Sequence, residues 1–155
     1  MEIIANRIHY EDMGESTKVA KDLFHESVKT ALIKEGWTIT KDPLTIRIDR
    51  VKLEIDLAAE KVFAAERDGQ KIAIEVKGFI QPSVISDFHT ALGQFLNYRL
   101  ALEMTDPDRI LYLAVPEDIS NNFFQERFVQ AAIKSYVLKL LVYNPSKEEI
   151  ILWQH

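Results

Sequence analysis

The chain has 155 residues, 47% of them hydrophobic, and a formal net charge of −5. This size and composition fit one ordinary domain with a single core, and no segment reaches the roughly 18 uninterrupted apolar residues that a membrane span needs. The sequence contains no cysteine, which excludes disulfide frameworks, thiolate zinc sites and cysteine nucleophiles. Any bound metal must therefore have oxygen or imidazole ligands, which favours magnesium, manganese or calcium.

The first 17 residues differ from the rest of the chain. They lack a sustained hydrophobic period and end in Gly14-Glu15-Ser16-Thr17. Charged residues stand where a signal peptide would have its apolar centre, so we expect a soluble, cytoplasmic protein. We predict that residues 1–17 are an N-terminal extension, a strand or tail, added to one domain that spans residues 18–155.

The net negative charge argues against a protein that coats nucleic acid non-specifically, because such affinity comes mainly from cations that release condensed counterions. Positive charge is nevertheless concentrated in one stretch, at Lys29, Lys34, Lys41, Arg47, Arg50 and Lys52. Acidic residues lie among these cations, at Glu26, Glu35, Asp42, Asp49 and Glu54. The stretch therefore forms either a local basic rim or an ordinary solvated surface of mixed charge.

In chain order, the first predicted helix spans residues 18–35, where apolar residues recur at helical spacing and Gly36 supplies a left-handed stop. Residues 37–40 and 44–48 then alternate apolar with polar around an Asp-Pro pair, which indicates an extended strand broken by a turn. A further strand is expected to begin near Leu53.

The clearest local signal is a hairpin over residues 62–77, with Asp68-Gly69 at its centre. An Asp-Gly pair suits a type I′ turn, whose twist matches that of paired strands. A turn centred there would make two compatible cross-strand pairs, one ionic and one apolar. These pairs are Glu66 with Lys71 and Phe63 with Ile74.

The second half of the chain alternates helices with strands. A helix is expected over residues 83–103, with Ser83 as its cap. A continuous apolar run at residues 109–115 is typical of a parallel strand covered on both faces. Another amphipathic helix is expected over residues 121–136, followed by strands at 138–143 and 149–153. The buried stripe of the 83–103 helix comprises Ile85, Phe88, Leu92 and Phe95. We therefore predict an α/β fold of the α+β type, with a mixed β-sheet flanked by helices.

A candidate catalytic constellation lies on the second strand of the hairpin. Strand alternation sends Ile74 and its alternate neighbours toward the core and presents Glu75 and Lys77 on the opposite face, away from the core and about 7 Å apart along the strand. Asp56 precedes the hairpin. Two carboxylates and a lysine at the ends of adjacent strands can hold a divalent cation and orient an attacking water against a phosphodiester. The alternative is a surface strand with an incidental Glu-x-Lys.

With Ile55-Asp56-Leu57 ahead of the hairpin and helices on either side, this Glu-x-Lys strand resembles the PD-(D/E)XK nuclease superfamily. The resemblance implies a restriction-endonuclease-like core in which Asp56 is the first acid, Glu75 the second and Lys77 the lysine. In that superfamily both acids bind the metal, which implies Mg²⁺ or Mn²⁺ as the cofactor and DNA as the substrate. The lysine polarises or orients the water and the scissile phosphate.

The spacing leaves the identity of the first acid open. Under the predicted hairpin register, Asp56 would lie about 20 Å from Glu75 at strand rise, and Glu60 would face Lys77. Either a bulge or bend near Ala58-Ala59 brings Asp56 back, or Glu60 is the acid that matters. We favour Asp56, because its isoleucine and leucine neighbours match the superfamily pattern.

Three further side chains are candidates for accessory roles. Gln94 and Tyr98 are four residues apart and share a helical face, and a Gln-x-x-x-Tyr pair after the Glu-x-Lys strand resembles the RecB-like branch, where it contacts the site or the nucleic acid. Glu26 resembles a third carboxylate that several families of the superfamily lend from the first helix. Each also fits an ordinary structural role.

His25 and His89 lack a partner pattern for a general base, and we expect both at the surface or its boundary.

Beyond the superfamily, the chain from Lys18 onward resembles the cyanobacterial XisH family of fdxN-element excision controlling factors. The stretches that carry this resemblance are KDLFHESVKTALIKEGWTITKDPL, EIDLAAEKVFAAERDGQKIAIEVKGF, SDFHTALGQFLNYRLAL, PDRILYLAVPEDI and FFQERFVQAAIKSY. The resemblance implies a role in programmed excision of a DNA element. It also implies a recombinase and a small companion protein of the XisI type as partners.

Two functional hypotheses follow. In the first, the protein is a Mg²⁺-dependent DNA endonuclease or nicking subunit, which the acid-x-Lys set favours. In the second, the same fold is a non-catalytic adaptor that binds the companion protein and DNA, which the negative net charge favours. The apolar content of the last third of the chain also favours a homodimer. The residues behind that expectation are Phe123, Phe124, Phe128, Tyr136 and Trp153.

Overall fold

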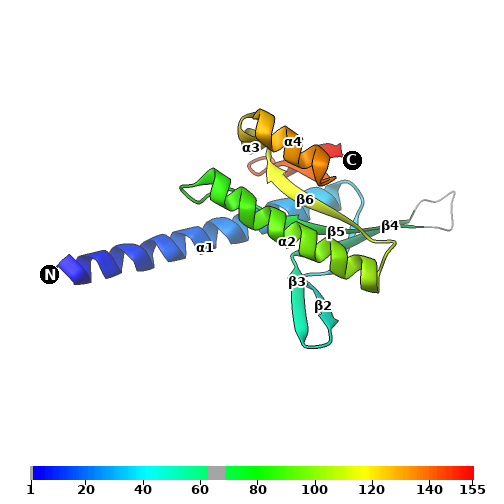
Figure 1. Ribbon diagram of the computed structural model, residues 1–155, viewed down its shortest axis with the longest axis horizontal. Helices are drawn as coiled ribbons and strands as arrows, with labels where there is room; N and C mark the ends of the chain where they lie inside the picture. The colour runs from blue at the N-terminus through cyan, green and yellow to red at the C-terminus, as the bar shows by residue number, and fades with distance from the viewer. Residues whose placement is uncertain (1, 63–68) are drawn as a thin grey trace.

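The computed structural model describes residues 2–62 and 69–155. In chain order its elements are α1 (Glu2–Lys34), β1 (Thr38–Lys41), β2 (Leu44–Ile48), β3 (Val51–Ile55), β4 (Leu57–Val62), β5 (Gly69–Val76), α2 (Val84–Thr105), β6 (Ile110–Pro116), α3 (Glu117–Asn121), the 3-10 turn η1 (Phe123–Gln125), α4 (Arg127–Ser135), β7 (Leu140–Asn144) and β8 (Glu149–Gln154) (Figure 1). None of the helices in these ranges is long and apolar enough to cross a membrane.

The strands form a mixed six-stranded sheet and a separate two-stranded sheet. The order in the large sheet is β1-β4-β5-β6-β7-β8, and β2 pairs only with β3. Strands β5, β6 and β7 run parallel to one another, while the other neighbouring pairs are antiparallel. Parallel neighbouring strands need a crossover connection, which is usually a helix, and α2 provides it between β5 and β6. The predicted mixed sheet with flanking helices and the predicted parallel strand β6 are confirmed.

Both faces of the large sheet are buried along its central strands. On one face, Val28 and Leu32 of α1 belong to the same apolar cluster as Ile72 and Ile74 of β5. On the other face, Ala73 of β5 belongs to the apolar cluster of α2 and α4. The expectation that the strand face with Glu75 points away from the core is therefore wrong, because α2 covers that face.

The β4–β5 hairpin has a different register from the predicted one. Lys71 lies opposite Glu60, and Ile74 lies opposite Leu57. The sequence predicted Glu66 opposite Lys71 and Phe63 opposite Ile74. Both predicted partners come later in the chain than the observed ones, so the predicted register is wrong. The alternation of buried and polar positions could not detect this error, because registers that differ by an even number of residues leave every side chain on the same face.

The turn of this hairpin is not centred where the sequence predicted it. Gly69, the predicted turn residue, belongs to β5 and lies opposite Val62. Residues 63–68, which include the predicted turn residue Asp68, lie outside the described residues. A local Asp-Gly signal therefore does not fix the register here.

Helix α1 confirms one prediction and corrects another. The helix predicted over residues 18–35 is present and ends at Lys34, shortly before Gly36, which adopts a φ of 90°. The expected strand or tail is wrong for residues 2–17, because they continue the same helix. Glycine costs only about 1 kcal/mol relative to alanine inside a helix, so Gly14 does not have to end it.

Two other helical predictions hold in part. Ser83 caps α2 as predicted, accepting a hydrogen bond from the Ser86 N–H at 3.3 Å, but Ile85 of the predicted stripe is exposed. The helix predicted over residues 121–136 is divided into η1 and α4, because Glu126 between them has extended backbone with a ψ of 139°.

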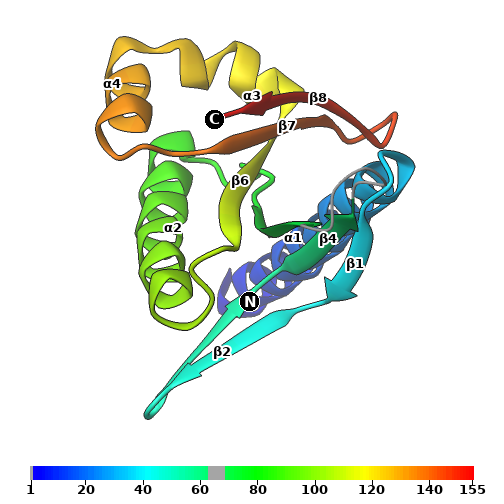
Figure 2. The ribbon, with the colours of Figure 1, turned by 90° about the vertical axis from the view of Figure 1, so that its right-hand side faces the viewer.

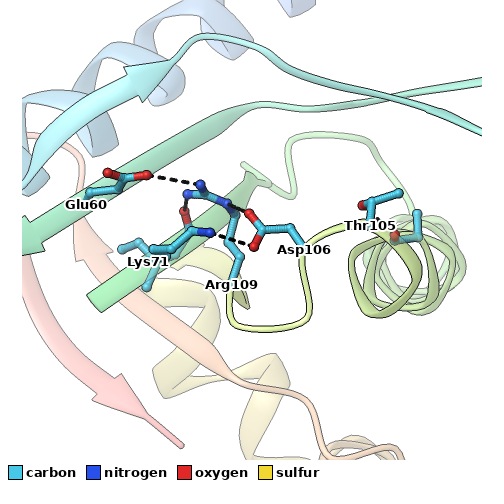
Figure 3. A network of polar contacts seen from close by, with 7 residues as sticks. Glu60, Lys71, Thr105, Asp106 and Arg109 are labelled. Carbon is cyan, nitrogen blue, oxygen red and sulfur yellow. Dashed lines mark hydrogen bonds and ion pairs between the residues drawn. The ribbon is translucent and has the colours of Figure 1, made fainter. Parts of the chain in front are cut away.

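A network around Arg109 joins β4, β5 and β6 to the end of α2 (Figure 3). The guanidinium donates to Glu60 Oε1 at 3.2 Å, to the Ile72 carbonyl at 3.1 Å and to Asp106 Oδ2 at 2.9 Å. The Lys71 ammonium also donates to Asp106, at 2.6 Å. The Arg109 side chain is only 9% exposed, so its guanidinium is largely shielded from solvent, and its bonds support the observed β4–β5 register.

We expect Arg109→Met to destabilise the fold by about 2–3 kcal/mol, because it removes charge-assisted bonds and leaves the Ile72 carbonyl without this donor. Urea unfolding at neutral pH measures the change. Lys52→Met is the matched control, since the Lys52–Glu54 ion pair is half exposed and should contribute less than about 1 kcal/mol. Equal free energies of unfolding in the two variants would contradict a structural role for the network.

Candidate functional site

Asp56 and Glu75 face each other at one end of the β4–β5 pair. Asp56 is the residue between β3 and β4, where the chain leaves the two-stranded sheet and enters the large one. Because Leu57 lies opposite Ile74, the preceding residue comes opposite Glu75. The Asp56 N–H donates to Glu75 Oε1 at 3.3 Å, and the Val76 N–H donates to Asp56 Oδ2 at 2.8 Å. Backbone bonds therefore hold both carboxylates together.

Glu60 lies at the other end of the same strand pair. Its partner Lys71 is four residues from Glu75 along β5, or about 13 Å at strand rise. The Glu60 carboxylate accepts from Arg109 instead. Of the two acids that the sequence left open, the structure brings Asp56 to Glu75, and it does so without the bulge expected near Ala58-Ala59, since the β4–β5 pairing is regular.

Lys77 follows the end of β5, and its ammonium lies 3.5 Å from Glu75 Oε2. Its backbone is held on both sides, because the Lys77 N–H donates to the Ala114 carbonyl at 3.0 Å and the Tyr143 hydroxyl donates to the Lys77 carbonyl at 3.4 Å. The three residues predicted as a catalytic set are therefore brought together.

The chain after Lys77 is held tightly against α1. A side chain at Gly78 would clash with the ring of Phe24, so glycine is required for this close approach. Phe79 adopts a left-handed φ of 54°, which costs about 1–2 kcal/mol in a residue other than glycine. Burial of its ring against Phe124, at 5.4 Å between centroids, offsets this cost and fixes the path of the chain beyond the lysine.

The Glu75 carboxyl is buried, with 5% of the residue exposed. This burial, together with the adjacent Asp56 carboxylate, raises the pKa of Glu75 to about 8, although the Lys77 ammonium acts in the opposite direction. Glu75 is therefore largely protonated at neutral pH when no cation is bound. Such a perturbed acid in a cavity wall is typical of functional sites.

The three side chains open onto a cavity of about 580 Å³. Its wall comes from α1, from the chain after β5 and from the start of α2. Asp56 and Glu75 form the floor at the end of the strand pair, and Lys77 stands beside them. The other lining residues are Lys21, Asp22, Phe24, His25, Val76, Gly78, Phe79, Ile80, Gln81, Asp87 and Thr90.

Several polar residues of this wall, among them Asp22, His25 and Asp87, were not singled out as site residues from the sequence. Asp22 lies one helical turn before Glu26 on α1, and helical spacing is the signal that could have indicated it. His25 bonds through Nε2 to Asp42 Oδ1 at 2.8 Å. Asp87 accepts from the Gln81 N–H at 3.1 Å. Glu26 itself is exposed and does not line the cavity, so its accessory role stays a prediction.

Tyr98 and Gln94 both lie on α2, and neither lines the cavity. Burial, together with the charges of Glu75 and Asp56, raises the pKa of Tyr98 to about 12, so its hydroxyl stays protonated at neutral pH. Gln94 Oε1 is buried and has no hydrogen-bond partner within the described residues. Their accessory roles also stay predictions.

The donor set fits a hard divalent cation. Asp56 and Glu75 supply facing carboxylates, and a cation between them would relieve the repulsion that contributes to the raised Glu75 pKa. No group of three or more His, Cys, Asp or Glu residues within the described ranges could hold a metal. Two carboxylates with water and substrate oxygens nevertheless suffice for Mg²⁺, which usually retains several waters.

Comparison with known proteins places the chain in a family. Residues 18–151 match the model of the XisH protein family. The crystal structure of an fdxN element excision controlling factor protein from Anabaena variabilis is 52% identical, with a TM-score of 0.78, and the match covers 86% of this chain and 99% of that one.

A second solved structure gives the same result. The XisH family protein from Nostoc punctiforme PCC 73102 is 48% identical, with a TM-score of 0.78 and the same coverage of both chains. The comparison with curated proteins gave no match. Since the family model spans most of the sequence and both solved structures share its fold, this chain belongs to the XisH family.

Proposed function

We propose that this protein is a controlling factor for excision of an fdxN-type DNA element and acts as a Mg²⁺-dependent DNA endonuclease or nicking subunit of the PD-(D/E)XK type. The observation that carries this proposal is the pairing of Asp56 and Glu75 beside Lys77 on the floor of an open cavity. The excision role is taken from the Anabaena relative, and the restriction-endonuclease-like core is part of the proposal.

In this mechanism Asp56 and Glu75 hold the cation and Lys77 acts on the substrate. A divalent cation at this site would activate water and stabilise negative charge on the phosphate. Lys77 can donate to a phosphate oxygen or orient the water, because its ammonium lies beside Glu75 at the cavity floor. Lys21 adds a second positive charge to the wall. Tyr98 and Gln94 would support the acids from α2.

A non-catalytic adaptor of the same fold is the second candidate, and exposed apolar side chains near α4 favour it. Phe128, Tyr136 and Val137 are 67%, 45% and 62% exposed. Exposed aromatic residues are common anchors of protein interfaces, and these would suit an XisI-type companion or a second copy of the chain. An adaptor would co-purify with its partner and cleave no DNA under any metal.

Replacing Glu75 with alanine should abolish Mg²⁺-dependent nicking of supercoiled plasmid. We expect a loss of more than about hundredfold, since even outer-shell partners of metal ligands cost ten- to hundredfold. Glu103→Ala is the matched control, because it removes an exposed carboxylate of α2 that does not line the cavity. Gel assays with both variants, after circular dichroism has shown that they fold, provide the measurement. Equal nicking by Glu75→Ala and the wild type would contradict catalysis at this site.

Cation binding should strengthen as the pH rises. Because the pKa of Glu75 is raised to about 8, a cation must displace its proton at lower pH. The apparent affinity for Mn²⁺ should therefore rise by up to about tenfold per pH unit between about pH 6 and pH 8 and then level off. Isothermal titration calorimetry measures this, with Glu75→Gln as a control that lacks the rise. A pH-independent affinity in the wild type would contradict the assignment of Glu75 as a ligand.

A further inference from the structure

The β2–β3 hairpin extends away from the body of the protein (Figures 1 and 2). Its base is anchored, because Ile46 and Ile55 are buried in the same apolar cluster as the inner face of α2. The outer half carries exposed side chains, and the chain reverses at Asp49 and Arg50 between paired Ile48 and Val51. The hairpin is therefore a two-stranded ribbon with a fixed base and a solvent-exposed tip.

The exposed part of this ribbon carries three cations, Arg47, Arg50 and Lys52, together with two acids, Asp49 and Glu54. Arg47 lies directly opposite Lys52, and both are exposed. Like charges that face each other across two strands are destabilising unless an anion lies near them. Lys52 has a partial partner in Glu54 at 2.9 Å, whereas neither Arg47 nor Arg50 has a partner within the part of the chain that the structure describes.

Two other cations of the same basic stretch are already engaged. The Lys29 ammonium donates to Asp42 at 2.9 Å, and the Lys34 ammonium donates to the Lys147 carbonyl at 3.0 Å. The basic stretch of the sequence therefore contains both lysines that are bonded within the protein and two arginines, Arg47 and Arg50, that lie on the ribbon. In a chain with a net charge of −5, such a local concentration is where a polyanion would first be attracted.

We propose that the β2–β3 hairpin is a DNA-binding arm that contacts duplex backbone beside the cleavage site. This inference rests on the proposed function, since it takes DNA as the substrate. A two-stranded β-ribbon fits the major groove, and guanidinium groups bind phosphate oxygens in a bidentate manner. Arg47, Arg50 and Lys52 are the contacting residues.

The arm and the candidate metal site are continuous in the chain. Strand β3 leads directly into Asp56, which follows Lys52 by four residues and Arg50 by six. At strand rise these cations lie about 13 and 20 Å from Asp56. Laid along a duplex that rises 3.4 Å per base pair, the arm contacts phosphates about four to six base pairs from the scissile bond. DNA bound by the arm would thus be placed at a fixed distance from the two acids.

The test measures DNA affinity separately from cleavage. Duplex binding is followed by fluorescence anisotropy in EDTA, where cleavage cannot occur, at salt concentrations from about 50 to 200 mM, for the wild type and Arg47→Ala/Arg50→Ala. The matched control, Arg127→Ala/Lys134→Ala, removes the same charge from α4, which lies at the opposite end of the molecule (Figure 2). Both arm residues are exposed, so the variant should keep the wild-type melting temperature.

The arm variant should lose two phosphate contacts, which lowers the slope of log affinity against log salt by about 1.8. Raising the salt concentration across this range should therefore weaken DNA binding by the arm variant by a factor about tenfold smaller than it does for the wild type. The control should keep the wild-type slope. Equal slopes in all three proteins, or a wild type that binds no DNA, would overturn the inference. Nicking assays on the same samples are independent: a wild type that binds through the arm but never nicks defeats only the nuclease proposal.

Discussion

The facing carboxylates of Asp56 and Glu75 constrain the rest of this structure. Two acids that meet at a buried position repel each other, and the repulsion grows as the surrounding dielectric falls. The Lys77 ammonium at 3.5 Å offsets part of this cost, and the proton that Glu75 retains at neutral pH offsets more. The β4–β5 pairing, the backbone N–H groups aimed at both carboxylates and a core on each face of the sheet hold the pair in place.

Local signals in the sequence predicted the elements better than their pairing. Gly36 and Ser83 marked helix ends correctly because each acts through its own backbone or side chain. The β4–β5 register depends instead on distant contacts, including the packing of Leu57 and Ile74 against α1 and the bonds of Arg109. Neither hydrophobic alternation nor an Asp-Gly pair contains that information, which is why the hairpin was predicted in the wrong register.

The same register explains how much of the candidate site the sequence could indicate. Asp56, Glu75 and Lys77 were chosen by their resemblance to a nuclease pattern, while the predicted register separated Asp56 from Glu75; the observed register removes this conflict. Burial of Glu75 was missed because the coverage of its strand face by α2 depends on tertiary packing. Asp22 and His25 were missed because only the approach of α1 to the end of β5 brings them to the cavity.

We propose that Asp56 and Glu75 together form one cation site. A crystal of the protein soaked in Mn²⁺ and measured at the manganese absorption edge provides the test. We expect an anomalous peak between the Asp56 and Glu75 carboxylates, with Lys77 beside it and Glu60 still bonded to Arg109. A cavity without any anomalous peak, or a peak bound by Glu60 in place of Asp56, would contradict it.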